Sequence, residues 1–366
     1  MRLSGDRIFA IIVLILVVGG IAMFSSAALG LLARASASPW KIAVAQIGLG
    51  LIPGLIALVI ARFLPPKILL RLILPFYVVS ILATLAVFIP HVGATVNGAS
   101  RWINLGFTTV QPAEFLKVSV ILMVSGYLAQ MKNKLSNWRY GLVGFGLIVG
   151  IPLVLLIFQP NTSTALIIAA SCGVLYFLAG APGRDFAIMG IAVVLVLAAL
   201  VATRPYLMKR VMTFLHPSHN SATSGYQIQQ SLIAIGSGQL VGRGFGQSVQ
   251  KFNYLPEPES DSVFAVYGEE FGFIGCILLV LLFVAFAARG LMISAEASTS
   301  FGVLAAAGLT LIITFSAFMN IGAMLGILPL TGLPLPFVSH GGTALMAALA
   351  SVGIILNVAA HRKKKS

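Results

Sequence analysis

Long apolar runs recur along the whole chain and restrict the folds open to it. An α-helix needs about 20 apolar residues to cross a hydrocarbon core of about 30 Å. Hydrophobic residues make up 59% of the 366 residues and charged residues 9%, whereas a soluble domain carries about 25% charge. We therefore expect an all-α polytopic membrane protein that forms one domain over residues 1–366. Its ten predicted helices span roughly 8–32, 42–63, 67–89, 112–130, 140–158, 163–181, 185–203, 265–288, 300–325 and 342–360.

The distribution of basic residues predicts the orientation. With the N-terminus inside, 14 of the 23 lysines and arginines fall on the inner side, as the positive-inside rule requires. Both termini are then cytoplasmic, and the long segment 204–262, between the seventh and eighth helices, is extracytoplasmic. The expected location is the cytoplasmic membrane, with multiple passes. The net charge of +14 is explained by this orientation, and no basic stripe interleaved with aromatic residues indicates a nucleic-acid partner.

Acidic residues are scarce and concentrated. Five of the nine fall between Glu257 and Glu270, on the predicted outer side, and carboxylates near a bilayer are costly and commonly functional. Asp261 lies where the long segment returns to the membrane. Ser260-Asp261-Ser262 before an apolar run fits a helix N-cap. The other interpretation is a general base at the lipid–water boundary.

A second polar group opens the predicted helix 112–130. Glu114 and Lys117 are three residues apart, so a local ion pair is the simplest interpretation. A lysine one turn inside a membrane span also needs a buried partner or an aqueous cavity. Arg101, on the same outer side, fits an interfacial anchor beside Trp102 or, together with Lys117, a binding site for an anionic headgroup.

Two further segments depart from helical patterns. Glycines at 236, 238, 242, 244 and 246 give only a weak signal for a phosphate-binding loop, because no strand precedes them and no Gly-Lys-Ser/Thr follows. Tight turns explain them equally well. The proline-rich stretch 328–342 interrupts an apolar region. Such backbone is tolerated at membrane depth only where it lines protein or water, so we expect a broken, cavity-lining element that includes Ser339 and His340.

Four sequence blocks together resemble the SEDS family, the FtsW/RodA group. They are the Asn-Gly-Ala-x-Arg-Trp…Gln-Pro-x-Glu-x-x-Lys block at 97–117, the Tyr-Gln…Gln-Ser block at 226–246, the Leu-Pro-Glu…Asp…Glu-Glu block within 246–275, and the Leu-Pro-x-Thr-Gly-Leu-Pro-Leu-Pro-Phe block within 324–342. The likeness covers nearly the whole chain. Segments 205–211 and 247–251 are more similar to the division branch than to the elongation branch.

The resemblance implies a peptidoglycan glycosyltransferase that polymerises lipid II at the outer face of the membrane. It implies that Asp261 is the essential loop aspartate and that Arg101, Glu114 and Lys117 line a central polar cavity. The expected partners are a class B penicillin-binding protein and other divisome or elongasome membrane proteins, with enrichment at the septum. No cofactor is certain from the sequence; Mg²⁺ or Mn²⁺ is an optional aid to the leaving group, for which Arg101 and Lys117 are the candidate cations. Further candidate site residues are Glu257, Ser339 and His340.

Three positions depart from the family pattern. Asn161 stands where Asp is frequent, Ser262 replaces a customary Phe, and His340 replaces a Tyr with an imidazole that could titrate near neutral pH. Two rival functions stay open on the residues alone. One is a lipid flippase or transporter with Arg101, Glu114 and Lys117 along its route, and the other is a non-catalytic scaffold for a transpeptidase.

Overall fold

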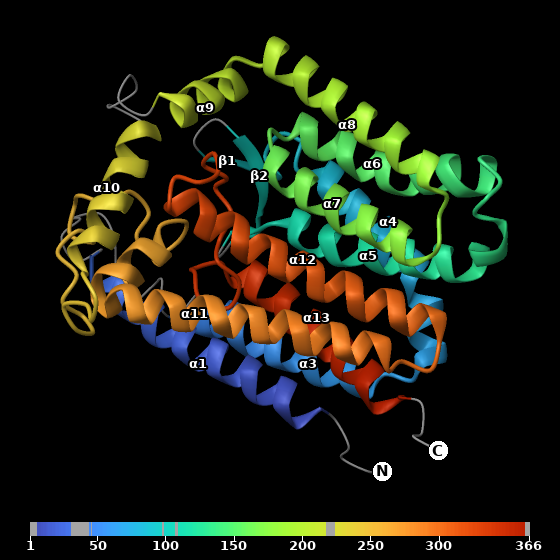
Figure 1. Cartoon of the computed structure of the whole chain (residues 1–366), viewed down its shortest axis with the longest axis horizontal. Coiled ribbons are helices and arrows are strands. Elements are labelled where there is room, and N and C mark those ends of the chain that lie inside the picture. The colour runs from blue at the N-terminus through green and yellow to red at the C-terminus, as the bar shows by residue number, and fades with distance from the viewer. Residues whose placement is uncertain are drawn as a thin grey trace.

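The computed structural model describes residues 6–30, 44, 46–96, 99–106, 109–216 and 224–362. Its long helices run side by side and form one bundle (Figure 1). The elements are α1 (Arg7–Leu29), η2 (Gln46–Leu51), α3 (Ile52–Phe63), α4 (Pro66–Ala86), β1 (Gly93–Val96), β2 (Ala99–Asn104), β3 (Thr109–Val110), α5 (Pro112–Met131), η3 (Lys132–Lys134), η4 (Arg139–Val143), α6 (Gly144–Phe158), α7 (Thr162–Leu178), α8 (Gly183–Thr203), α9 (Pro205–Leu215), α10 (Ser224–Ser237), α11 (Val263–Ala295), α12 (Ser300–Met324) and α13 (Gly342–Ala360).

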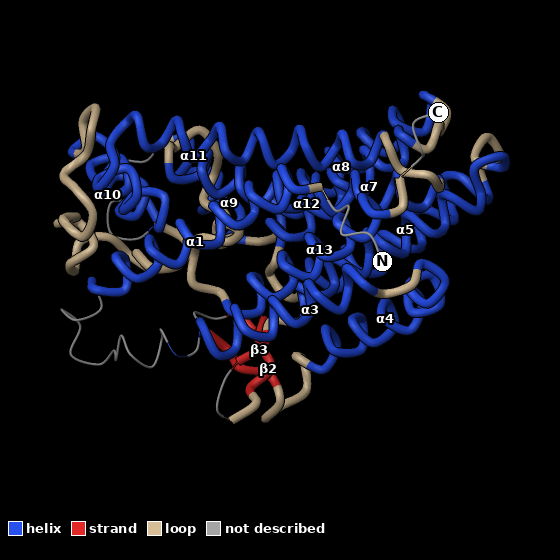
Figure 2. Tube along the Cα trace, turned by 90° about the horizontal axis from the view of Figure 1, so that it is seen from below, coloured by secondary structure: helices blue, strands red, loops and turns tan. Residues whose placement is uncertain are grey.

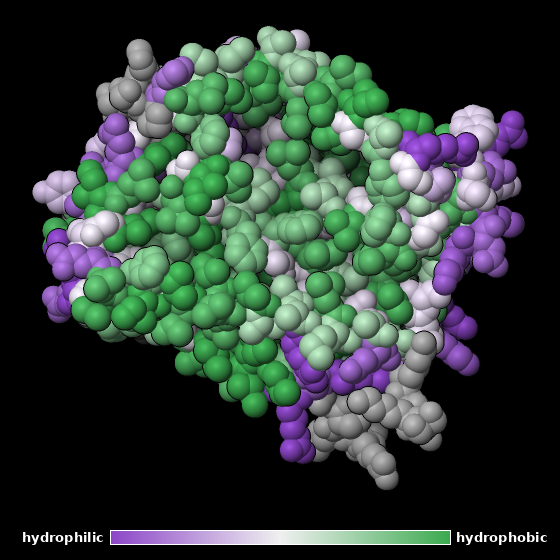
Figure 3. Space-filling model, viewed as in Figure 1, coloured by the Kyte–Doolittle hydropathy of each residue, from purple (hydrophilic) through white to green (hydrophobic). Residues whose placement is uncertain are grey.

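The centre of the bundle is formed by α5, α12 and α13, whose apolar stretches are each 72% buried. Helix α12 packs against α5, α7, α11 and α13, and α13 also packs against α3. The peripheral helices α1, α4, α6 and α8 turn leucine, isoleucine and valine side chains outward, so most of the visible surface is apolar (Figure 3). A surface of this kind is stable in lipid and not in water. The chain is therefore a multi-pass membrane protein.

Helices occupy all the predicted spans as far as these are described, but the count of ten is not confirmed. Among the described residues, nine helical stretches are long and apolar enough to cross a membrane. The predicted span 163–181 is α7, which has 17 residues and falls below that length. The predicted ends at 31–32 and the positions 42, 43 and 45 lie outside the described residues. The segment 204–262 contains α9 and α10, and its residues 217–223 are likewise outside.

A small antiparallel sheet, absent from the all-α prediction, lies between α4 and α5. Its strand order is β1-β2-β3, with Gly93 opposite Ile103 and Ile103 opposite Val110. Figure 2 shows the sheet at one edge of the bundle. Residues 97 and 98, the start of the first block that resembles the SEDS family, are outside the described part. The sheet carries Arg101 on β2 and leads directly into α5.

The proline-rich segment between α12 and α13 is irregular and buried, as predicted. From Leu325 to Gly341 it forms no helix or strand, while Leu335 and Phe337 are almost fully buried. Its backbone is satisfied by side chains: Asn320 Nδ2 donates to the Leu333 carbonyl at 2.7 Å, and the Leu335 amide donates to Ser339 Oγ at 2.7 Å. Backbone paired in this way can lie at membrane depth.

The two ends of the described chain meet at one end of the bundle. The Asp6 carboxylate caps α1 by accepting from the Phe9 amide at 2.9 Å and lies 2.6 Å from Arg289. It also pairs with Arg362, which in turn contacts Glu296 at 2.8 Å. Burial raises the pKa of Asp6, but hydrogen bonds from the two arginines outweigh it and lower that pKa to about 2.

Candidate active site

Asp261 lies in the turn that leads into α11, and its segment is held from two sides. The N-cap of α11 is Ser262, so the prediction that Asp261 caps this helix is wrong. Asn320 Nδ2 donates to the Asp261 carbonyl at 2.9 Å, and Ser260 Oγ donates to its carboxylate at 3.3 Å. The bond from Asn320 fixes the backbone of Asp261, and the Asp261 carboxylate is exposed to the charges of Glu257, Arg101 and Arg210.

Ser339 and His340, both predicted as site residues, hold this turn from the irregular segment. Ser339 Oγ donates to the Ser260 carbonyl at 2.7 Å, and the His340 amide donates to the Glu259 carbonyl at 2.7 Å. The His340 ring stacks on Phe24, with ring centroids 5.7 Å apart. Burial lowers the pKa of His340 below its ordinary value.

The environment of Asp261 raises its proton affinity. Burial raises the pKa of its carboxyl from 3.8 to about 6, and the negative charge of Glu257 acts in the same direction. The hydrogen bond from Ser260 and the positive charges of Arg101 and Arg210 oppose this rise without cancelling it. A carboxylate with this pKa is mostly ionised at neutral pH and yet accepts a proton more readily than an ordinary aspartate.

Arg101 on β2 and Arg210 on α9 both carry positive charges that favour the ionised form of Asp261. A Cβ built on Gly332 would lie 3.5 Å from Asp261 Oδ2 and 3.9 Å from an Arg210 guanidinium nitrogen, so both groups border this glycine. Burial, and then the repulsion from Arg210, lower the pKa of Arg101. Two guanidinium groups that approach each other beside a carboxylate form a site suited to an anion.

The two arginines are positioned by the start of α7 and by α9. Arg101 donates to the Pro160 carbonyl, while its buried Nε has no hydrogen-bond partner in the described part of the chain. The guanidinium of Arg210 stacks over Tyr206 at 5.8 Å, and the Tyr206 hydroxyl bonds Thr162 Oγ1 at 2.5 Å. Arg210 was not among the candidates from the sequence, because an arginine in a predicted long loop gives no local signal.

Asn161 also belongs to this region of the structure. It is buried next to Pro160, and its Nδ2 has no hydrogen-bond partner among the described residues. The family's frequent Asp would add a negative charge here, whereas Asn161 supplies a neutral donor. Asparagine in place of aspartate at position 161 therefore makes the region around Pro160 more favourable for an anion.

Glu114 and Lys117 form the predicted ion pair, with Nζ 2.8 Å from Oε2, and both are buried. Pro112 occupies the first turn of α5, as expected for a helix start. The pair borders a small cavity of about 30 Å³, room for one or two waters. Leu333 lines this cavity and the adjacent Gly332 borders Asp261, so the irregular segment connects the two polar groups.

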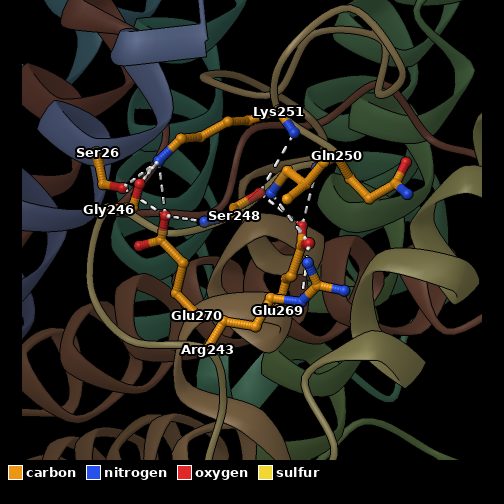
Figure 4. Close-up of polar contacts among 9 residues, drawn as sticks. Ser26, Arg243, Gly246, Ser248, Gln250, Lys251, Glu269 and Glu270 are labelled. Atoms are coloured by element: carbon orange, nitrogen blue, oxygen red, sulfur yellow. Dashed lines mark hydrogen bonds and ion pairs between the residues drawn. The ribbon is translucent and has the colours of Figure 1, made fainter.

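A second buried charge cluster holds the loop that precedes Asp261. Lys251 Nζ donates to Glu270 Oε1 at 2.8 Å, to Ser26 Oγ at 3.0 Å and to the Gly246 carbonyl at 2.8 Å (Figure 4). Both Lys251 and Glu270 are almost fully buried. These contacts join the loop to α1 and α11, so three segments that are distant in sequence are fixed together.

Glu269 binds the same loop through its backbone. Its carboxylate accepts from Ser248 Oγ at 2.6 Å and from the amides of Val249 and Gln250 at 3.0 and 3.1 Å (Figure 4). Gly242, Gly244 and Gly246 have positive φ, as tight turns require, and Gly242 lies against the α11 backbone. Gly236, by contrast, lies within α10. Glu269 and Glu270, members of the acidic group in the sequence, thus have structural partners.

The donor set around Asp261 does not fit a resident metal. The described residues contain no group of three or more His, Cys, Asp or Glu side chains that could hold one. The charged groups that influence the Asp261 carboxylate are the Glu257 carboxylate and the guanidinium groups of Arg101 and Arg210. The two guanidinium groups repel a cation. The described residues around Asp261 therefore provide no ligand set for Mg²⁺ or Mn²⁺.

The family model for FtsW, RodA and SpoVE, described as "Cell cycle protein", matches residues 6–364. The chain belongs to this family. The match spans the sheet, the irregular segment and the Asp261 turn. The SEDS resemblance seen in the sequence is thereby confirmed.

Relatives from different branches of the FtsW/RodA/SpoVE family are similar to this chain. Stage V sporulation protein E of Bacillus subtilis (strain 168) is 38% identical over 277 residues, 76% of each chain. Peptidoglycan glycosyltransferase MrdB of Escherichia coli (strain K12) is 38% identical over 321 residues, 86% of this chain and 84% of that one. A solved chain from "Structural coordination of polymerization and crosslinking by a peptidoglycan synthase complex" aligns over 100% of both chains with a TM-score of 0.81 and 27% identity.

Proposed function

We propose that this FtsW/RodA/SpoVE-family protein is a peptidoglycan glycosyltransferase that polymerises lipid II into glycan strands at the outer face of the cytoplasmic membrane. The observation that carries the proposal is the Asp261 carboxylate, with its pKa raised to about 6, beside Arg101 and Arg210. A base and two cations at one place suit a reaction that removes a proton and releases an anion. The enzyme class named for the relative MrdB supports the same function.

Asp261 acts as the general base in this proposal. It accepts the proton of the acceptor sugar's 4-hydroxyl while that oxygen forms a bond to the donor's anomeric carbon. The bond from this carbon to the lipid pyrophosphate breaks at the same time, and the pyrophosphate leaves with the electron pair. A base with a pKa near the working pH is efficient because it is ionised and still accepts a proton.

Arg101 and Arg210 stabilise the departing pyrophosphate. Arginine binds phosphate oxygens through two parallel N–H groups. Glu114 keeps the charge of Lys117 local through the 2.8 Å ion pair. The Glu114–Lys117 pair is therefore close to neutral as a unit, and the two arginines take the direct contacts with the pyrophosphate.

The orientation follows from the basic residues. Arg7, Arg62, Arg71 and Arg139 lie at helix ends that the positive-inside rule assigns to the cytoplasm. Arg289 and Arg362, clasped with Asp6, belong to the same side. Asp261, at the opposite end of α11 from Arg289, then faces the outer surface, where lipid II carries its sugars.

A partner penicillin-binding protein is part of the proposal. The structural neighbour belongs to a peptidoglycan synthase complex that coordinates polymerization and crosslinking. We propose that this chain works in such a complex with a class B penicillin-binding protein and with divisome or elongasome membrane proteins. The predicted preference for the division branch, with septal enrichment, stays a prediction because the sporulation and MrdB relatives share the same identity with the chain.

The test is polymerisation of labelled lipid II by the purified protein in liposomes, with and without a cognate class B partner. Asp261→Asn keeps the shape and removes the base, and we expect it to lower the rate by about 10²–10⁴-fold. Glu296→Gln, a matched change of a partly exposed carboxylate at the far end of α11, is the control. Unchanged glycan ladders in Asp261→Asn would refute the role of this residue.

The same liposomes separate the two rival functions. A flippase would move labelled lipid II across the membrane without forming ladders. If the protein is only a scaffold, the activity of its penicillin-binding partner should be the same with the wild-type protein and with Asp261→Asn. Ladders that require Asp261 exclude both as the sole function.

A further inference from the structure

An apolar groove runs between α1 and α11 on the lipid-facing side of the bundle. Its volume is about 430 Å³, within the range of about 300–1,000 Å³ that ligand sites typically have. Figure 1 shows the two helices alongside each other, and Figure 3 shows that the surface in this part of the molecule is apolar. No lining residue carries a charge.

Small residues on α1 give the groove its depth. Gly19 and Ala22 line it and are exposed, and a Cβ built on Gly19 meets nothing within 4 Å. Gly20 also lines the groove, and a Cβ there would collide with the Phe337 carbonyl, so only glycine fits at this position. The helix therefore leaves open space at Gly19 that no neighbouring side chain fills.

The groove adjoins the turn that carries Asp261. Val338 forms part of its wall, and the next residue, Ser339, donates to the Ser260 carbonyl at 2.7 Å. Asp261 follows Ser260 directly. The backbone of Val338 and Ser339 thus lies between the groove and the Asp261 turn.

The outer end of the groove is built by a fixed loop. Phe245 lines it together with Tyr267 and Phe271 of α11. The neighbouring Gly246 carbonyl accepts from Lys251 Nζ at 2.8 Å, and Lys251 is paired with Glu270 (Figure 4). The buried charge cluster therefore fixes the loop that borders the groove.

We propose that this groove holds the first part of the polyprenyl chain of a lipid-linked sugar substrate. The inference rests on the proposed function, since it assigns the lipid end of the substrate whose sugar faces Asp261. An uncharged, narrow channel that starts beside the sugar site and runs down two membrane helices matches an isoprenoid tail attached to a polar head. A bilayer is as apolar as the groove, so burial there gains little hydrophobic energy. The groove instead orders the tail and so orients the sugar.

The experiment blocks the groove without disturbing the bundle. Gly19→Phe places a ring in the open space, and Ala22→Phe narrows a second point in case the first variant fails to fold. Val18→Phe, on the lipid-exposed side of the same helix and outside the groove lining, is the matched control, and Gly19→Ala tests backbone effects alone. Each protein is assayed with lipid II bearing a long polyprenyl tail and with an analogue bearing three isoprene units.

We expect Gly19→Phe to lower kcat/KM for the long-tailed substrate by roughly tenfold, because a misplaced reactant loses orientation. The short-tailed analogue should be affected much less, and Val18→Phe should keep the wild-type ratio between the two. An unchanged ratio in both Gly19→Phe and Ala22→Phe overturns the proposal.

Photolabelling tests the groove independently of polymerisation. A polyprenyl phosphate with a photoreactive group in its first isoprene units should label residues 15–23 and 267–282 in wild type and not in Gly19→Phe. Long polyprenyl phosphate should compete, and phospholipid at the same concentration should not. Equal competition by phospholipid identifies a site for bulk lipid and overturns the proposal. Specific labelling by a protein that makes no ladders keeps the groove and rejects the proposed glycosyltransferase.

Discussion

Removing the buried ammonium group of Lys251 should destabilise the protein strongly. Lys251 and Glu270 are almost fully buried and paired at 2.8 Å, and the three Lys251 donors each have an acceptor. Lys251→Met keeps much of the side-chain volume and leaves the Glu270 carboxylate buried without its cation. Breaking a buried ion pair in this way costs about 3–5 kcal/mol.

Removing both charges should cost much less than the sum of the single changes. In Lys251→Met/Glu270→Leu no buried charge is left, and replacement of a whole buried pair by apolar groups is often neutral. Ser26 and Ser248 lose an acceptor on Glu270, which costs about 1–3 kcal/mol for each buried group left unsatisfied. The double-mutant cycle should therefore give a coupling energy of at least about 2 kcal/mol.

The measurement is equilibrium unfolding in mixed micelles, followed by tryptophan fluorescence. Lys209→Met, the same substitution at an exposed position on α9, is the control. Limited proteolysis within 243–256 distinguishes release of this loop from global unfolding. The cluster does not stabilise the loop if two results are obtained together. The free energy of unfolding of Lys251→Met would lie within about 1 kcal/mol of that of Lys209→Met, and segment 243–256 would resist proteolysis equally in both variants.

Two further predictions concern catalysis. Because the Asp261 carboxylate must be ionised and its pKa is raised to about 6, kcat/KM should fall as the pH drops through about 6. Glu257→Gln removes a negative charge that raises this pKa, so the acid limb of the pH profile should move to lower pH. An acid limb that stays in place would contradict the assignment. Arg210→Met should lower kcat by about 10²–10³-fold, the cost of losing one group that stabilises developing negative charge, whereas Arg210→Lys should retain part of the rate; steady-state polymerisation measures both, and wild-type turnover in Arg210→Met would rule out its role.

Residues whose partners are close in sequence were predicted best. The spacing of Glu114 and Lys117 on one helix predicts their ion pair, and it forms. The prolines of 328–342 predict a broken segment, because they cannot continue a helix. Asp261 became a candidate through its place at the end of a long loop, and its role as a base stays a prediction; its competing interpretation as the N-cap was wrong by one residue.

The missed features depend on contacts that the chain forms only when folded. Arg210 reaches Asp261 from a short helix in a segment interpreted as loop, and their common neighbour Gly332 is far along the chain. Lys251 and Glu270 are 19 residues apart, a spacing that neither a helix nor a strand brings together. The sheet had a local signal in short runs of β-branched and aromatic residues, which the membrane-helix pattern overshadowed.

The contact between the chain ends has a practical consequence for studies in living cells. Asp6 is shared by Arg289 and Arg362, so residues 6 and 362 are neighbours at one end of the bundle, and labels attached at these positions start close together. Two fluorescent proteins fused there would exchange excitation energy efficiently in the folded protein and lose this signal when the clasp opens. Such a doubly tagged chain would report assembly of the bundle in the membrane, without any assay of its chemistry.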